Sequence, residues 1–104
     1  MIIYNRYIYV RIYQDSHDKL VFYTGITEDM SRRQEQHDLG LCRTTNRYNK
    51  SYKLKEIKYK GYDEVTLVML RELERKFKKL ELKHKIEMTD YWEVWRVGVS
   101  PPVG

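Results

Sequence analysis

The sequence predicts a small α+β domain: a three-stranded, mainly antiparallel sheet flanked by helices in the order ββαβα, with a C-terminal tail. Two strand-like stretches, residues 7–13 and 20–23, are separated by a short polar loop, which is typical of an antiparallel hairpin. Helical segments then follow on both sides of one further strand, which favours α+β over a doubly wound parallel sheet. The 104 residues, 41% of them hydrophobic, suit a single soluble domain.

The first stretch has the two-residue period of a strand, because Ile8, Val10 and Ile12 alternate with tyrosines and Arg11. A second apolar run over residues 20–23 completes the hairpin. We expect Gly25 to break this second strand, and Thr27 or Asp29 to cap the helix that follows.

Residues 30–39 are predicted to be a helix that ends at Gly40, a residue favoured just past a helix end. Residues 41–51 show no periodicity and are predicted to be a loop with room for a short helical turn. Residues 52–59 alternate again. Leu54 and Ile57 do not share one strict face, so this third strand is expected to contain a bulge or a register break.

Residues 64–87 are predicted to form one long helix, with Asp63 as its N-cap after a turn at 61–63. Its apolar stripe consists of Leu70, Leu73, Phe77 and Leu80. Residues 88–104 differ in character and contain Trp92 and Trp95. A fourth strand, an arm covering the core and a partner-binding tail all remain open for this segment.

Basic residues concentrate in the middle of the chain. The whole sequence carries a net charge of +5, whereas residues 32–60 hold nine Lys and Arg against three acidic residues, a net +6. Tyr48, Tyr52 and Tyr59 are interleaved with these charges. Cations neutralise phosphates and aromatic faces stack on bases, so the pattern favours a nucleic-acid partner over a merely solvated surface with strand tyrosines.

The cysteine content and the hydropathy of the chain indicate where the protein is located. The single cysteine, Cys42, excludes an internal disulfide and a Cys-rich zinc knuckle. There is no apolar stretch long enough to span a bilayer, and the start of the chain does not resemble a secretory signal. We therefore expect a cytoplasmic, reducing environment and no membrane association.

Five side chains carry groups that can bind phosphate, transfer a proton or hold a metal ion. Arg33 and His37 are four residues apart and share one helix face, where a guanidinium binds phosphate and an imidazole moves protons. Tyr9 and Tyr23 lie on neighbouring strands of the hairpin. Glu74 sits at the border of the apolar stripe, where a carboxylate can hold a hard divalent cation. Taken singly, each also fits a surface pair, cross-strand packing or a helix ion pair.

In chain order these residues form a recognisable set: YIY at 7–9, YTGIT at 23–27, RR at 32–33 followed by His37, and E-x-x-F-K-K-L at 74–80. This set resembles the GIY-YIG nuclease family, especially its small stand-alone members, over residues 6–87. A basic, Thr-containing stretch at 40–47 adds to the resemblance. Tyr7 replaces the first glycine of the family name, and Thr24 replaces the central isoleucine of the second motif.

The resemblance implies a metal-dependent endonuclease that hydrolyses phosphodiester bonds in DNA with Mg²⁺ or Mn²⁺. The implied catalytic residues are Tyr9, Tyr23, Arg33, His37 and Glu74, with Glu74 as the metal ligand and Glu72 as its fallback. The five are expected to converge on one positively charged hollow, where cationic surroundings lower the pKa of Tyr9 so that it deprotonates the attacking water. The predicted nucleic-acid-binding residues are Arg11, Arg32, Arg43, Thr44, Arg47, Lys50 and Lys53.

The expected substrate is branched or duplex DNA, in repair or recombination, read by structure or with weak sequence specificity because so small a domain offers little surface for reading bases. Residues 88–104 are treated as a tail that follows the nuclease-like domain at 6–87. Two alternatives remain: a non-catalytic nucleic-acid-binding module of the same fold, and an interaction domain anchored by Trp92 and Trp95. A homodimer or a larger protein partner, bound through the tail, also remains open.

Overall fold

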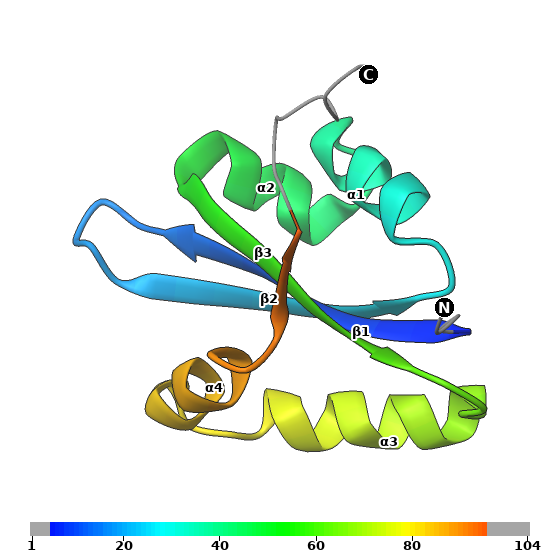
Figure 1. The fold of residues 1–104 in the computed structure, drawn as a ribbon. Coiled ribbons are helices and arrows are strands. Elements are labelled where there is room, and N and C mark those ends of the chain that lie inside the picture. The colour runs from blue at the N-terminus through cyan, green and yellow to red at the C-terminus, as the bar shows by residue number, and fades with distance from the viewer. Residues whose placement is uncertain (1–4, 96–104) are drawn as a thin grey trace, which may run out of the picture.

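The computed structural model describes residues 5–95, which form a four-stranded antiparallel sheet and four helices in the order ββααβααβ (Figure 1). The elements are β1 (Arg6–Gln14), β2 (Leu20–Thr27), α1 (Met30–Asp38), α2 (Arg43–Ser51), β3 (Lys53–Tyr62), α3 (Leu67–Lys78), α4 (Leu82–Thr89) and β4 (Glu93–Trp95). The predicted α+β class is confirmed. The sheet has one strand more than expected, β4, which comes from the segment predicted to be a tail. The rest of that segment, residues 96–104, lies outside the described residues.

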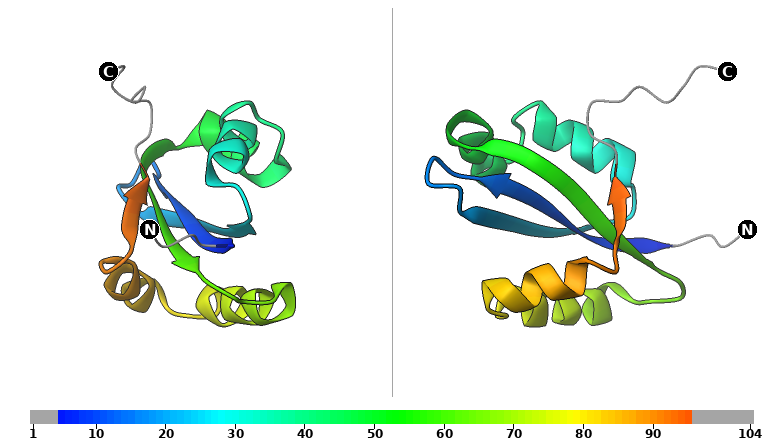
Figure 2. Two further views of the ribbon diagram at one scale, coloured as in Figure 1. Left: turned by 45° about the vertical axis from the view of Figure 1, so that its right-hand side comes forward. Right: turned by 60° about the vertical axis from the view of Figure 1, so that its left-hand side comes forward.

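The sheet separates two layers of helices, with α1 and α2 on one face and α3 and α4 on the other (Figure 2). The strand order is β2-β1-β3-β4, so β1 lies inside the sheet and β2 is an edge. Alternation along β1 supplies both cores: Ile8, Val10 and Ile12 pack towards α3, whereas Tyr9 packs with Ile57 on the α1 side. The predicted alternation along β1 therefore directs one set of its side chains to each face of the sheet.

Gly25 lies inside β2 and does not end it, so this expectation is wrong. It is paired with Tyr9 in the β1–β2 ladder. A Cβ at position 25 would lie 2.4 Å from the Tyr9 hydroxyl oxygen, so the absence of a side chain is what lets the phenol ring lie across the neighbouring strand. A glycine in a strand interior commonly marks such a close approach.

The first helix follows the sequence signals closely. The Asp29 side chain caps α1 by accepting a hydrogen bond from the Arg32 amide at 3.1 Å. Gly40 follows its end with a φ of +77°. The next helix, α2, was expected to be a loop with at most one turn. Only Thr45 of its nine residues is fully buried, so α2 has no apolar stripe to reveal it in the sequence.

The predicted bulge in the third strand is confirmed. Ile12 pairs with Glu56 but Tyr13 pairs with Leu54, so one extra residue of β3 stands between these two pairs. The shift turns Leu54 to the same side of the sheet as Ile57, where Leu54 packs against the cluster that Ile57 forms with Tyr9 and Met30.

The predicted single helix over 64–87 is two helices, α3 and α4, and Thr66 rather than Asp63 caps the first. The apolar stripe explains the break. At the same spacing past Phe77 and Leu80 the stripe would continue with polar residues, whereas α4 turns Thr89, which is buried, and Ile86, which is partly buried, towards the protein. A separate helix can rotate these two residues towards the protein, whereas one continuous helix would point them away from its apolar stripe.

Candidate active site

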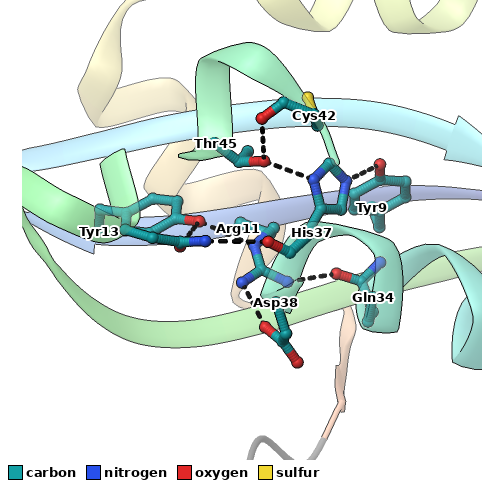
Figure 3. Close-up of polar contacts among 9 residues, drawn as sticks. Tyr9, Arg11, Tyr13, Gln34, His37, Asp38, Cys42 and Thr45 are labelled. Atoms are coloured by element: carbon teal, nitrogen blue, oxygen red, sulfur yellow. Dashed lines mark hydrogen bonds and ion pairs between the residues drawn. The ribbon is translucent and has the colours of Figure 1, made fainter. Parts of the chain in front are cut away.

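A tyrosine, a histidine and an arginine meet on the α1 side of the sheet. Helix α1 places His37 over β1, so that its Nε2 lies 2.6 Å from the Tyr9 hydroxyl oxygen (Figure 3). Arg33, one turn earlier on the same helix, donates from Nε to that oxygen at 3.2 Å. Tyr9 and His37 are fully buried, whereas Arg33 is partly exposed. The guanidinium therefore joins the buried pair to the surface.

Both ring nitrogens of His37 lie within hydrogen-bond distance of a hydroxyl group. Its Nδ1 lies 2.7 Å from Thr45 Oγ1, and that hydroxyl in turn donates to the Cys42 carbonyl oxygen at 3.5 Å. With the Thr45 hydroxyl donating to this carbonyl, an imidazole hydrogen on Nδ1 satisfies the contact with Thr45 and leaves Nε2 to accept from Tyr9. Figure 3 shows the resulting chain, which runs from Tyr9 through His37 and Thr45 to Cys42.

Tyr23 packs against the same histidine. Its ring centroid lies 5.1 Å from that of His37 and 6.5 Å from that of Tyr9. The Cys42 sulfur donates to the Tyr23 hydroxyl at 3.6 Å. Burial alone would raise the pKa of this thiol, but hydrogen bonds from Thr45, Tyr23 and the Thr44 backbone together outweigh it and lower the pKa to about 7. Cys42 and Thr45 were not among the predicted site residues, because the helix that presents them was not foreseen.

Burial governs the ionisation of the cluster. It raises the pKa of Tyr9, and the hydrogen bond and charge of Arg33 only partly oppose it. Burial also raises the pKa of Tyr23. The expectation that cationic surroundings lower the pKa of Tyr9 is therefore wrong. Burial, followed by the charges of Arg11 and Arg33, lowers the pKa of His37 to about 3. At neutral pH both phenols are protonated and the imidazole is uncharged.

Arg11 is buried inside the protein and does not fit its predicted contact with nucleic acid. Its side chain is fully buried and donates to Tyr13, Gln34 and Asp38, each at 2.9 Å. The Tyr13 hydroxyl donates in turn to Asn49 of α2 at 2.9 Å. Arg11 thus ties β1 to α1, and through Tyr13 to α2, which holds the histidine-bearing helix on the sheet (Figure 3).

The other predicted nucleic-acid-binding residues lie at or near the surface. Arg43, Arg47 and Lys50 follow one another at helical spacing on α2 and are exposed. Arg32 on α1 and Lys53 at the start of β3 are also exposed. The sixth residue, Thr44, is partly buried. Their contact with nucleic acid stays a prediction.

Glu74 does not join the cluster. It lies on α3, across the sheet from α1, with its side chain 19% exposed and its carboxylate 3.8 Å from the Lys78 ammonium. Within residues 5–95, no hydrogen bond or ion pair links it to Tyr9 or Arg33. Glu72, on the same helix, is exposed and paired with Arg75. Of the five side chains expected to converge in one hollow, the structure brings four together.

The described residues contain no group of three or more His, Cys, Asp or Glu side chains able to enclose a metal ion. A single carboxylate is nevertheless compatible with Mg²⁺, which commonly keeps several waters and binds one or two carboxylates together with substrate phosphates. Glu74 suits this mode, because its carboxylate is partly accessible and its one ion pair is long.

The chain matches the GIY-YIG catalytic domain over residues 5–87. The chain belongs to the GIY-YIG family. This GIY-YIG domain is therefore a nuclease, an enzyme that hydrolyses phosphodiester bonds, and its substrate is a nucleic acid. GIY-YIG nucleases generally depend on a divalent metal. No curated protein and no solved structure shows a significant match to the chain.

The GIY-YIG match ends within α4, so β4 lies beyond it. Inside the match, the tyrosines of the two motifs, Tyr9 and Tyr23, come from adjacent strands, and Gly25 provides the space for the first of them. The order of these short motifs along the chain thus corresponds to one cluster in space.

Proposed function

We propose that the protein is a metal-dependent endonuclease that hydrolyses phosphodiester bonds in branched or duplex DNA, guided by DNA structure or with weak sequence specificity. The observation that carries this proposal is the fixed position of the Arg33 guanidinium. Its Nε bonds Tyr9 and its Nη1 bonds Gln36 at 3.0 Å, while the side chain remains partly exposed. A preorganised guanidinium is well suited to hold a non-bridging phosphate oxygen and to neutralise charge in the transition state.

Tyr9 and His37 supply a path for a proton. Tyr9 is protonated at neutral pH, so it can accept a proton from the attacking water only while it passes its own to Nε2 of neutral His37. The charge of Arg33 disfavours a protonated His37, and a phosphate bound at Arg33 offsets that charge. Tyr23 packs edge-on against the imidazole and keeps its ring in place.

Glu74 is the residue that would hold Mg²⁺ or Mn²⁺. The bound ion would stabilise negative charge on the leaving oxygen and the phosphoryl group. Helix α3 packs against β2, the edge strand that also carries Tyr23 beside α1. A DNA strand that follows this edge would lie close to both faces of the sheet.

A cleavage panel tests the proposal. Linear duplex, branched and single-stranded DNA are incubated with the protein in Mg²⁺ or Mn²⁺, and in EDTA. We expect EDTA to abolish cleavage and Arg33→Ala to lower kcat/KM by about 10²–10³-fold, the usual loss for one transition-state hydrogen-bond donor. Glu74→Ala should abolish metal-dependent cleavage, whereas Glu72→Ala, two residues away on the exposed side of α3, should retain it. Full cleavage by Glu74→Ala would contradict the assignment of the metal ligand.

The surroundings of this site support a DNA-directed role inside the cell. The exposed basic residues of α2 begin directly after Cys42, which contacts the cluster, so we propose that they hold the DNA backbone. None of the helices within residues 5–95 is long and apolar enough to cross a membrane. We further propose a cytoplasmic location and a part in DNA repair or recombination, with residues 6–87 as the nuclease unit and β4 (Glu93–Trp95) as a strand added to its sheet.

A further inference from the structure

Three aromatic side chains, Tyr7, Tyr59 and Trp95, lie beside the catalytic cluster without belonging to it. We propose that they form a stacking platform for an unpaired nucleobase next to the scissile phosphate. This inference rests on the proposed nuclease function and narrows its substrate to nucleic acid with unpaired nucleotides at the cleavage site.

The sheet register places the platform on the same face as the catalytic tyrosine. Tyr9 of β1 pairs directly with Tyr59 of β3, and Tyr59 pairs with Glu93 of β4. Directly paired residues of antiparallel strands project their side chains to the same face. Trp95 is two residues from Glu93 and so shares that face. Strand β4 thus extends the catalytic face beyond the part of the chain that matches the family.

Tyr59 lies between the other two rings of the platform and contacts both of them. The Tyr59 ring lies 5.9 Å from that of Tyr7 and 5.9 Å from that of Trp95, edge-on in both contacts. The Tyr59 hydroxyl donates to the Glu93 carboxylate at 2.6 Å, which fixes the orientation of the ring. All three aromatic residues are partly exposed. A partly exposed aromatic surface with fixed orientation is suited to stacking a base.

Charge around the platform sets the direction of the nucleotide. The Glu93 carboxylate repels phosphates, whereas Arg33 and the adjacent, exposed Arg32 attract them. A bound strand would therefore direct its backbone towards α1 and its base towards β3 and β4. A base held in intact duplex stacks on its neighbours and is not available to such a surface. Flaps, gaps and branch points supply unpaired bases.

The two tryptophans allow a matched fluorescence experiment in the full-length protein. Trp95 belongs to the platform, whereas Trp92 packs against Phe77 of α3 at 5.2 Å, on the other face of the sheet. Trp92→Phe leaves Trp95 as the only tryptophan, and Trp95→Phe leaves Trp92, so excitation selective for tryptophan reports on one of them at a time. Each variant is titrated in EDTA with a short oligothymidylate and with a blunt duplex of equal length. We expect saturable quenching of Trp95 by oligothymidylate, and no change in Trp92.

Affinity measurements complete the test. Binding of oligothymidylate is measured by the fluorescence anisotropy of a labelled strand. Trp95→Leu should weaken this binding by about 5- to 150-fold, which corresponds to the loss of one stacking aromatic side chain at about 1–3 kcal/mol. Binding of blunt duplex should be unchanged, and Trp95→Phe, which keeps an aromatic face, should restore most of the affinity. Urea unfolding curves establish that both variants are folded.

The inference is overturned if bound oligothymidylate leaves Trp95 fluorescence unchanged, if Trp95→Leu binds both DNAs like the parent protein, or if oligothymidylate does not bind. Metal-dependent cleavage of DNA that is lost in Arg33→Ala would still uphold the proposed function after any of these results. Absence of all cleavage would instead contradict the proposed function.

Discussion

Gly25→Ala is a small change with a large expected effect, because it acts on the catalytic tyrosine from the neighbouring strand. The new Cβ would lie 2.4, 2.5 and 2.9 Å from Oη, Cζ and Cε1 of Tyr9, all closer than van der Waals contact. Tyr9 is fully buried among well-packed residues, so its ring has little room to move away. The relief of the clash must therefore displace the phenol from His37 and Arg33.

The cost follows from these contacts. Overpacking a filled core costs about 1–3 kcal/mol. The Tyr9 hydroxyl makes hydrogen bonds to His37 and Arg33, and losing each costs about 0.5–1.5 kcal/mol. We therefore expect Gly25→Ala to lower the free energy of unfolding by about 2–6 kcal/mol. A displacement of about 1 Å within the cluster should lower kcat/KM by about 10²-fold.

A double-mutant cycle checks the cause. Urea unfolding is measured for the parent protein, Gly25→Ala, Tyr9→Leu and the double variant. If the clash with the ring is responsible, the cost of Gly25→Ala should fall below about 1 kcal/mol once the ring is absent. An equal cost with and without the Tyr9 ring, or parent-like stability and cleavage in Gly25→Ala, would refute the reasoning.

Three further predictions concern stability. Arg11→Met should lower the free energy of unfolding by about 2–4 kcal/mol in urea, because the guanidinium donates to Tyr13, Gln34 and Asp38. The salt dependence of DNA binding should be unchanged, since the Arg11 side chain is fully buried; a weaker salt dependence in the folded variant would return Arg11 to the DNA surface. Folding lowers the pKa of His37 from an unfolded value near 6.5 to about 3, so the contribution of His37 to the free energy of unfolding is constant above about pH 6.5 and is lost as the pH falls towards 3, by at most about 1.4 kcal/mol per pH unit. Between pH 7 and 5, the free energy of unfolding of His37→Gln should therefore fall less than that of the parent protein; parallel curves of stability against pH would exclude this linkage. A chain that ends at Glu87 should lose about 3–5 kcal/mol, because it lacks the packing of Trp92 and Trp95, and should sediment with an unchanged association state; a change of association state would assign the segment to an interface.

The sequence predicts those parts of the fold whose signals are local. Alternation of Ile8, Val10 and Ile12 identified the central strand, and Gly40 marked the end of α1 because a positive φ is needed there. Leu54 and Ile57 are three residues apart and cannot share one face of a regular strand, so their positions predict the bulge that the strand pairing contains. Each of these features depends on residues only a few positions apart.

The remaining features depend on contacts between distant residues. Helix α2 is held by polar contacts such as the one from Tyr13 to Asn49, so it has no hydrophobic period. Arg11 looks like a surface cation in the sequence, and its partners, the buried Gln34 and the exposed Asp38, come from a helix more than twenty residues away. The site shows the same limit. Its motif residues were identified in the sequence, but the burial that sets the ionisation of Tyr9 appears only when the helices pack.

The short final strand has a consequence for how copies of the protein behave together. Strand β4 pairs only with residues 57–59 of β3, and within the described residues the start of β3 has no partner on that side. An unpaired strand edge is a template for self-association. Lys53 and Lys55, both exposed at this edge, oppose it because they repel the same lysines of a second copy. Lys53 is also one of the residues proposed to hold DNA. A bound polyanion that neutralises Lys53 would weaken the repulsion between copies. The same positive charge therefore serves both to bind the substrate and to keep copies of the protein apart.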